Sequence, residues 1–107
     1  GGISQKSKKS RTIKKKKHIL YYFGTDWCHY CKLFNKKWSS LKQFYNKSNL
    51  TLKKVLINDK NQDLIQHYSI QSYPSIVLVK NNGEIIHYLS DKREKKDIDA
   101  FLKKNKV

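Results

Sequence analysis

Cys28 and Cys31 are the only two cysteines in this chain of 107 residues, and they lie three positions apart in the stretch DWCHYCK. In a helix this spacing places both sulfur atoms on one face, within reach of a disulfide. A thiolate at a helix N-terminus is stabilised by unpaired backbone N–H groups and by the helix dipole, which lower its pKa. The pair could therefore exchange disulfides, with Cys28 as the attacking sulfur and Cys31 as the resolving one.

Metal or haem chemistry fits the same pair less well. A structural zinc site needs four ligands, and this chain has a single CxxC pair and scattered histidines. Covalent haem attachment needs a histidine directly after the second cysteine, where the chain has Lys32. We therefore expect no metal and no cofactor. A third alternative, two cysteines that only pack in the core, stays open from the residues alone.

The elements around the cysteines would place Cys28 where a buried strand meets a helix. The apolar run HILYYF, from His18 to Phe23, is typical of a buried strand, and Gly24 ends it. From Cys28 to about Lys47, apolar residues recur at intervals of three and four, which predicts an amphipathic helix. These residues are Leu33, Phe34, Trp38, Leu41, Phe44 and Tyr45.

The rest of the chain predicts alternating strands and helices. We expect, in order, a strand from Leu50 to Ile57, a loop at 58–61, a short helix from Asp63 to Tyr68, a strand from Ile76 to Val79, a hairpin turn at Asn81-Asn82-Gly83, a returning strand at 84–89 and a helix from Asp91 to Lys104. A strand–helix–strand unit makes a parallel pair, and the hairpin adds an antiparallel edge. The predicted fold class is α/β, with a mixed central sheet of about four strands flanked by helices.

Residues 18–107 resemble thioredoxin and the catalytic domains of protein disulfide isomerase. The resemblance rests on Trp27-Cys28-x-x-Cys31-Lys32 after the aromatic strand, on Tyr73-Pro74-Ser75, and on the KNNGE hairpin. It implies a thioredoxin-like domain over 18–107. It also implies a thiol–disulfide oxidoreductase that acts on cysteine-containing proteins and depends on a partner reductase or oxidase.

The resemblance also implies roles for other residues. Pro74 would follow a cis peptide bond and face the cysteines, and the backbone of Tyr73 would pair with a bound peptide. Trp27 would flank the same groove, although ordinary packing is the alternative for both aromatic residues. His29 and Tyr30, between the cysteines, would tune the redox potential. His29 could donate to the Cys28 sulfur, or it could point to solvent.

Three positions depart from the family pattern. Tyr22 stands where thioredoxins carry a buried carboxylate that helps to deprotonate the resolving thiol. Lys36 replaces a proline that commonly kinks the helix, so a straighter helix is expected. The glycine that usually lines the groove would fall at Ser90 or Asp91. Tyr30 before the second cysteine is shared with glutaredoxins, but the chain lacks their Gly-Gly-Asp turn.

The charge is strongly basic and concentrated at the N-terminus. The net charge is +16, and residues 1–17 carry eight Lys or Arg and no acid. We expect a disordered tail, for which two roles are open. The lysines from Lys6 to Lys17 could contact nucleic acid or an anionic surface, or the segment could simply be a solvated arm.

Two functional hypotheses follow. The first is the oxidoreductase, and the alternative is a binding or scaffold module that the basic tail docks to nucleic acid or acidic partners. The sequence contains no run of 18 consecutive apolar residues, so it predicts no transmembrane segment. A cytoplasmic location is favoured, while a secretory lumen or a virion remains open if a targeting segment was removed.

Overall fold

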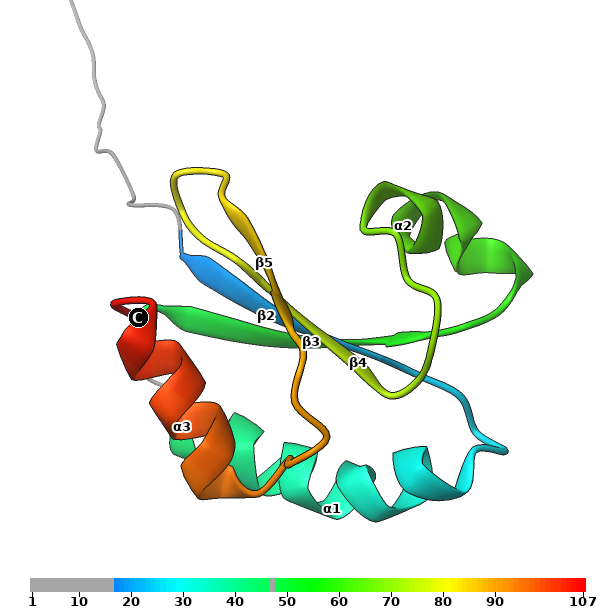
Figure 1. Ribbon diagram of the computed structural model, residues 1–107, viewed down its shortest axis with the longest axis horizontal. Coiled ribbons are helices and arrows are strands. Elements are labelled where there is room, and N and C mark those ends of the chain that lie inside the picture. The colour runs from blue at the N-terminus through cyan, green and yellow to red at the C-terminus, as the bar shows by residue number, and fades with distance from the viewer. Residues whose placement is uncertain (1–16, 47) are drawn as a thin grey trace, which may run out of the picture.

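A computed structural model describes residues 17–46 and 48–107 as one four-stranded mixed sheet with helices on both faces (Figure 1). The strands follow the order β3-β2-β4-β5 across the sheet. The elements are β2 (His18–Gly24), α1 (His29–Phe44), β3 (Leu50–Leu56), the 3-10 turn η1 (Asp59–Asn61), α2 (Gln62–His67), β4 (Ser75–Val79), β5 (Ile85–Tyr88) and α3 (Lys95–Lys104). The mixed α/β sheet of four strands is therefore confirmed.

Strand β2 lies in the interior of the sheet, between two partners. It runs parallel to β3, with His18 opposite Leu50, and antiparallel to β4, with Tyr22 opposite Ile76. Strand β5 completes the antiparallel edge after the hairpin. Because a central strand is covered on both faces, its run of apolar side chains is almost wholly buried.

Alternate residues of β2 contribute to two separate cores. Leu20 and Tyr22 pack beneath α1 and α3, whereas Tyr21 and Phe23 pack beneath α2. Figure 1 shows α1 and α3 on one side of the sheet and α2 on the other. The larger core holds Leu20, Tyr22, Phe34, Trp38, Leu41, Leu50, Leu52, Ile76, Leu78, Ile98 and Leu102. Neighbouring residues of one strand therefore have different surroundings.

Helix α1 is continuous over 16 residues, with Lys36 in its middle. Its buried side chains, Cys31, Phe34, Trp38 and Leu41, follow the helical spacing of three and four. Two residues of the predicted apolar face, Leu33 and Phe44, are exposed instead. They lie beside the buried stripe of the helix and not within it.

Several predicted boundaries differ from the structure. The last helix begins at Lys95, not at Asp91, because a capping box between Glu94 and Asp97 ends the preceding loop and starts the helix. The predicted loop at 58–61 contains η1, which the Asn58 side chain caps by accepting from the Lys60 N–H.

The hairpin turn has the predicted position but a different geometry. Of its three residues, only Gly83 has a positive φ, of 93°. The Gly83 N–H donates to the Lys80 carbonyl at 2.9 Å, which is the pattern of a turn followed by a glycine bulge.

Three sequence predictions concern either residues outside this description or features that the described residues lack. The basic tail at 1–17 lies outside the described residues, apart from Lys17. Within 17–46 and 48–107, no helix is long and apolar enough to cross a membrane. The same residues contain no cluster of three or more His, Cys, Asp or Glu side chains that could hold a metal ion.

Candidate redox site

Cys28 occupies the N-cap of α1, directly after the loop that follows β2. Its backbone N–H donates to the hydroxyl oxygen of Thr25 at 3.0 Å, which holds the turn between strand and helix. Its half-exposed sulfur lies 4.0 Å from the Tyr73 carbonyl oxygen, across the site.

The surroundings of Cys28 favour its thiolate. Slight burial raises the pKa of the thiol, but several groups outweigh it and hold the pKa below its ordinary value of 9.0. These are the backbone N–H and the thiol of Cys31, the backbone N–H of Tyr30 and the positive charge of Arg93. The helix N-terminus thus stabilises the anion as the sequence predicted.

Cys31 lies one turn further along α1 and is fully buried. Burial raises the pKa of its thiol, and the neighbouring Cys28 sulfur raises it further by its charge and hydrogen bond. The Thr25 N–H, which points at the Cys31 sulfur from 3.5 Å, opposes this shift. Both cysteines are free thiols. The site therefore pairs a partly accessible sulfur whose pKa is lowered with a buried sulfur whose pKa is raised.

Tyr22 fills the space beside Cys31 where the family resemblance expects a carboxylate. Its hydroxyl donates to the Cys31 carbonyl oxygen at 3.1 Å and to Asn35 Oδ1 at 2.9 Å. Burial raises the pKa of Tyr22 well above its ordinary value, and the nearby sulfur atoms of Cys31 and Cys28 raise it further. This side chain remains a neutral phenol and carries no negative charge into the site.

The predicted groove residues meet around the exposed sulfur. Trp27 is 71% exposed, and its ring packs edge-on against Tyr73, with centroids 5.6 Å apart. The Tyr73–Pro74 peptide bond is cis. A hollow of about 300 Å³ beside it is lined by Tyr30, Tyr73, Pro74, Asp91 and Arg93. Tyr73 thus joins these features: it lines the hollow with Pro74, its ring packs against Trp27, and its carbonyl oxygen lies near the Cys28 sulfur.

The two residues between the cysteines both face solvent. The His29 and Tyr30 rings pack edge-on, with centroids 5.6 Å apart. The groups that hold the Cys28 thiolate from this turn are backbone N–H groups, not the His29 side chain. Of the two orientations that the sequence left open for His29, the structure has the one towards solvent.

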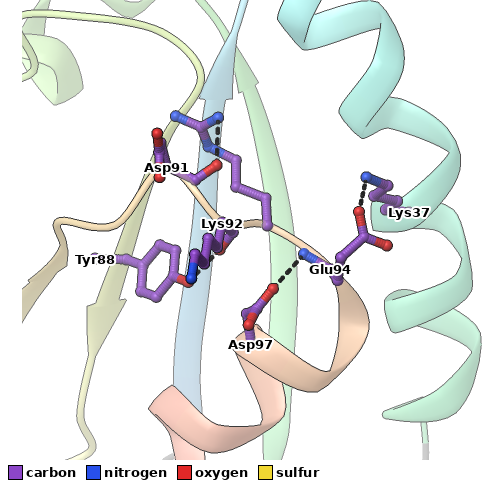
Figure 2. A network of polar contacts seen from close by, with 7 residues as sticks. Lys37, Tyr88, Asp91, Lys92, Glu94 and Asp97 are labelled. Carbon is purple, nitrogen blue, oxygen red and sulfur yellow. Dashed lines mark hydrogen bonds and ion pairs between the residues drawn. The ribbon is translucent and has the colours of Figure 1, made fainter.

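Arg93 belongs to the site, although the sequence analysis did not single it out. It lies in the loop between β5 and α3, far from the cysteines in sequence, and its charge lowers the pKa of Cys28. Figure 2 shows how polar contacts hold this loop: Lys37 of α1 pairs with Glu94, and the Tyr88 hydroxyl donates to the Lys92 carbonyl. One feature of the sequence could have drawn attention to Arg93: only two of the 24 basic residues are arginines.

Comparison with known proteins agrees with this arrangement. A family model described as thioredoxin matches residues 3–104, which is nearly the whole chain. The chain belongs to the thioredoxin family. It is 32% identical over 90 residues to "Thioredoxin 2" of Plasmodium falciparum, an alignment that covers 81% of this chain and 54% of that protein. A solved structure titled "Structure of a malarial protein" is 30% identical, with a TM-score of 0.68, and covers 85% of this chain and 99% of that one.

Other members of the thioredoxin family extend the comparison. The chain is 33% identical over 89 residues to a protein disulfide-isomerase of Hordeum vulgare, covering 80% of this chain but 17% of that protein. The fold also matches a chain from a complex of ferredoxin:thioredoxin reductase and thioredoxin f2, with 18% identity and a TM-score of 0.70, covering 86% and 80% of the two chains. The chain thus spans about half of its Plasmodium relative and under a fifth of the isomerase. These names support thiol–disulfide oxidoreductase chemistry in this thioredoxin domain.

Proposed function

We propose that this domain is a thiol–disulfide oxidoreductase that acts on protein substrates through Cys28 and Cys31. The observation that carries the proposal is that the two sulfur atoms differ in solvent exposure and that their pKa values shift in opposite directions. Cys28 is accessible and its pKa is lowered, whereas Cys31 is buried and its pKa is raised. Such a pair separates attack on a substrate from the later resolving step, because only one sulfur is a nucleophile at the start.

The reaction would transfer two electrons in two steps. The Cys28 thiolate attacks one sulfur of a substrate disulfide, a mixed disulfide forms, and the other substrate sulfur leaves as a thiolate that takes up a proton. Cys31 then loses its proton to solvent, and its sulfur attacks Cys28. The mixed disulfide breaks, the second substrate thiolate is released and protonated, and the protein is left with a Cys28–Cys31 disulfide. The reverse sequence oxidises a dithiol substrate.

The surroundings of Cys28 suit a polypeptide substrate. Trp27 and Tyr73 offer exposed aromatic surface near the attacking sulfur, and the buried Pro74 follows Tyr73 in the wall of the neighbouring hollow. The Tyr73 carbonyl faces the site, where it can accept a backbone hydrogen bond from an extended peptide. In this proposal His29 and Tyr30 tune the redox potential through the backbone of their turn and through their exposed rings. The net charge of +16 favours acidic partners.

Repeated turnover needs a redox partner, since each cycle changes the state of the cysteine pair. A reductase would regenerate the dithiol, and an oxidase would regenerate the disulfide. The structural match to a thioredoxin chain in a reductase complex supports the first kind of partner. The alternative hypothesis of a tail-docked binding module depends on residues 1–17 and stays a prediction, as does contact with nucleic acid.

The test is the reduction of insulin by the domain with dithiothreitol as electron donor. We expect the wild type to accelerate precipitation of the insulin B chain and Cys28→Ser to give only the background rate. Cys31→Ser should form mixed disulfides that accumulate, because the resolving sulfur is gone. Equal activity of the wild type and Cys28→Ser would contradict the proposal. The equilibrium potential against glutathione then gives the direction: roughly −270 mV indicates a reductant, and about −180 mV an oxidant or isomerase.

A further inference from the structure

The Tyr22 phenol is a buried polar group that the disulfide exchange described above does not use. Its side chain is fully buried, and it projects from β2 towards α1. Its hydroxyl reaches two residues of α1, the Cys31 carbonyl at 3.1 Å and Asn35 Oδ1 at 2.9 Å. Cys31 and Asn35 lie four positions apart and therefore on one face of the helix. One phenol thus contacts both the resolving cysteine and a polar side chain one turn beyond it.

The Tyr22 hydroxyl faces more hydrogen-bond acceptors than its single hydrogen can serve. A phenol has one hydrogen and so can donate fully to only one acceptor at a time. The Cys31 carbonyl lies within α1, where it also accepts from the helix backbone. Burial raises the pKa of the Cys31 thiol, whereas the Tyr22 hydroxyl lowers it, so this neighbour favours the thiolate. The hydrogen can therefore move from a resting acceptor to the sulfur when the sulfur gains charge.

Gly24 provides the room that this arrangement needs. A Cβ atom at Gly24 would lie 2.7 Å from Tyr22 Cε1 and 2.8 Å from its hydroxyl oxygen, which is closer than atoms can pack. The φ of Gly24 is not in the left-handed region, which among the described glycines only Gly83 occupies. Glycine is required at position 24 because a side chain would overlap the Tyr22 ring, and not because the backbone adopts a conformation that favours glycine.

The charged and titratable groups around the phenol keep it in its neutral form. Lys54 of β3 places Nζ 5.7 Å from the centroid of the ring. Arg93, from the loop before α3, lowers the pKa of Tyr22, while burial and the sulfur atoms of Cys31 and Cys28 raise it more strongly. The hydroxyl is thus a hydrogen-bond donor at neutral pH and not a base.

We propose that the Tyr22 hydroxyl, held by Asn35 and given room by Gly24, donates a hydrogen bond to the Cys31 sulfur as that sulfur becomes the resolving thiolate. The proposal rests on the proposed disulfide exchange. Tyr22 keeps its own proton throughout: the Cys31 proton leaves to solvent, the Cys31–Cys28 bond forms, the mixed disulfide breaks, and the released substrate thiolate takes up a proton. The phenol stabilises a buried negative charge during this step alone.

The test separates the two steps in a single turnover with dithionitrobenzoate. Attack by Cys28 releases a first thionitrobenzoate, and attack by Cys31 on the mixed disulfide releases a second, so the two phases report on the two sulfur atoms. We expect Tyr22→Phe to slow the second phase about tenfold at pH 7, and to leave the first phase within about twofold. The pH midpoint of the second phase should move upward, because the thiolate has lost a donor.

Tyr21→Phe is the matched control. It makes the same chemical change one residue earlier, on the other face of the sheet, where Tyr21 packs against Tyr68. It should leave both phases within about twofold. Asn35→Ala keeps the phenol but removes its anchor on α1, and should slow the second phase about threefold. This variant also provides a test if Tyr22→Phe folds poorly.

The outcomes distinguish this proposal from the proposed function. If the second phase has the same rate and pH profile in the wild type, Tyr22→Phe and Asn35→Ala, the proposed role of Tyr22 is wrong. The proposed disulfide exchange would remain intact. Equal slowing by Tyr21→Phe and Tyr22→Phe would show a general packing effect and would also overturn it. A wild type without any second phase would overturn both proposals.

Discussion

The two sides of the redox site share one turn of α1 but differ in composition and in solvent access. The exposed side comprises Trp27, Cys28, Tyr73 and Arg93, and the buried side comprises Tyr22, Gly24, Cys31 and Asn35. On the exposed side, backbone N–H groups and a positive charge meet a sulfur that solvent can reach. On the buried side, a neutral phenol bonds to the Asn35 amide and to the backbone carbonyl of Cys31, whose sulfur has no solvent contact.

In the proposed function, this difference gives the two cysteines of one CxxC pair separate chemical roles. A helix N-terminus stabilises an anion at its first residue far more than one turn later, so position alone favours ionisation of Cys28. Desolvation acts in the opposite direction on Cys31 and keeps its proton in place until a mixed disulfide requires it. The predictions below test this asymmetry, from the largest expected effect to the smallest.

The largest expected difference is in alkylation of the two cysteines. The thiolate is the reactive form, and the pKa of Cys28 is lowered while that of Cys31 is raised. At pH 7 we expect iodoacetamide to modify Cys28 roughly a hundredfold faster than Cys31, as measured by mass spectrometry of quenched peptides. The midpoint of the Cys28 rate profile should lie below pH 9 and that of Cys31 above it. Equal rates would contradict the asymmetry.

Gly24→Ala tests the room on the buried side. The new Cβ atom would overlap the Tyr22 ring, so we expect a loss of about 2 kcal/mol in the free energy of unfolding of the reduced protein, measured with denaturant. Gly83→Ala is the control, because it places alanine at a φ of 93° in open space and should cost about 1 kcal/mol. Only Gly24→Ala should also slow the second thionitrobenzoate phase. The same slowing in both variants would contradict the role of Gly24.

Trp27→Ala tests substrate contact on the exposed side. Removing the exposed ring should lower kcat/KM for insulin about fivefold, which corresponds to about 1 kcal/mol of lost contact. The first phase with dithionitrobenzoate should change little, since the small reagent does not span the groove. Phe44→Ala removes a ring of similar exposure, 62%, at the other end of α1 and should leave both assays unchanged. Equal losses in the two variants would exclude a groove at Trp27.

The smallest expected effect concerns Arg93. Replacing it with glutamine removes a positive charge that lowers the pKa of Cys28, so the pKa should rise and the thiolate fraction at pH 7 should fall. We expect the first thionitrobenzoate phase to slow about twofold at low salt and less at high salt, because screening weakens the interaction. Lys92→Gln removes the same charge one position earlier and should have a smaller effect. Equal effects of the two substitutions would show that only net charge matters, and a larger effect of Lys92→Gln would contradict the role of Arg93.

Much of the architecture could be predicted because it depends on local patterns. The strand HILYYF, the three-and-four spacing of α1 and the Asn-Gly turn each determine their own element, and the parallel and antiparallel pairs follow from their order. The errors lie at boundaries and at the edge of the apolar stripe. The segment 91–94 continues the helical pattern in sequence, but the capping box of Glu94 and Asp97 places the helix start at Lys95.

The sequence by itself identified the candidate reactive pair and its place at a strand-to-helix junction, since CxxC, the preceding apolar strand and the following periodicity are all short-range features. Only the tertiary structure decided which residues meet these sulfur atoms. The Tyr22 hydroxyl reaches Asn35 across 13 positions, and the Cys28 sulfur faces the Tyr73 carbonyl across 45. Such contacts arise because a central strand, a helix and two loops converge at one end of the sheet, and no local pattern records that convergence.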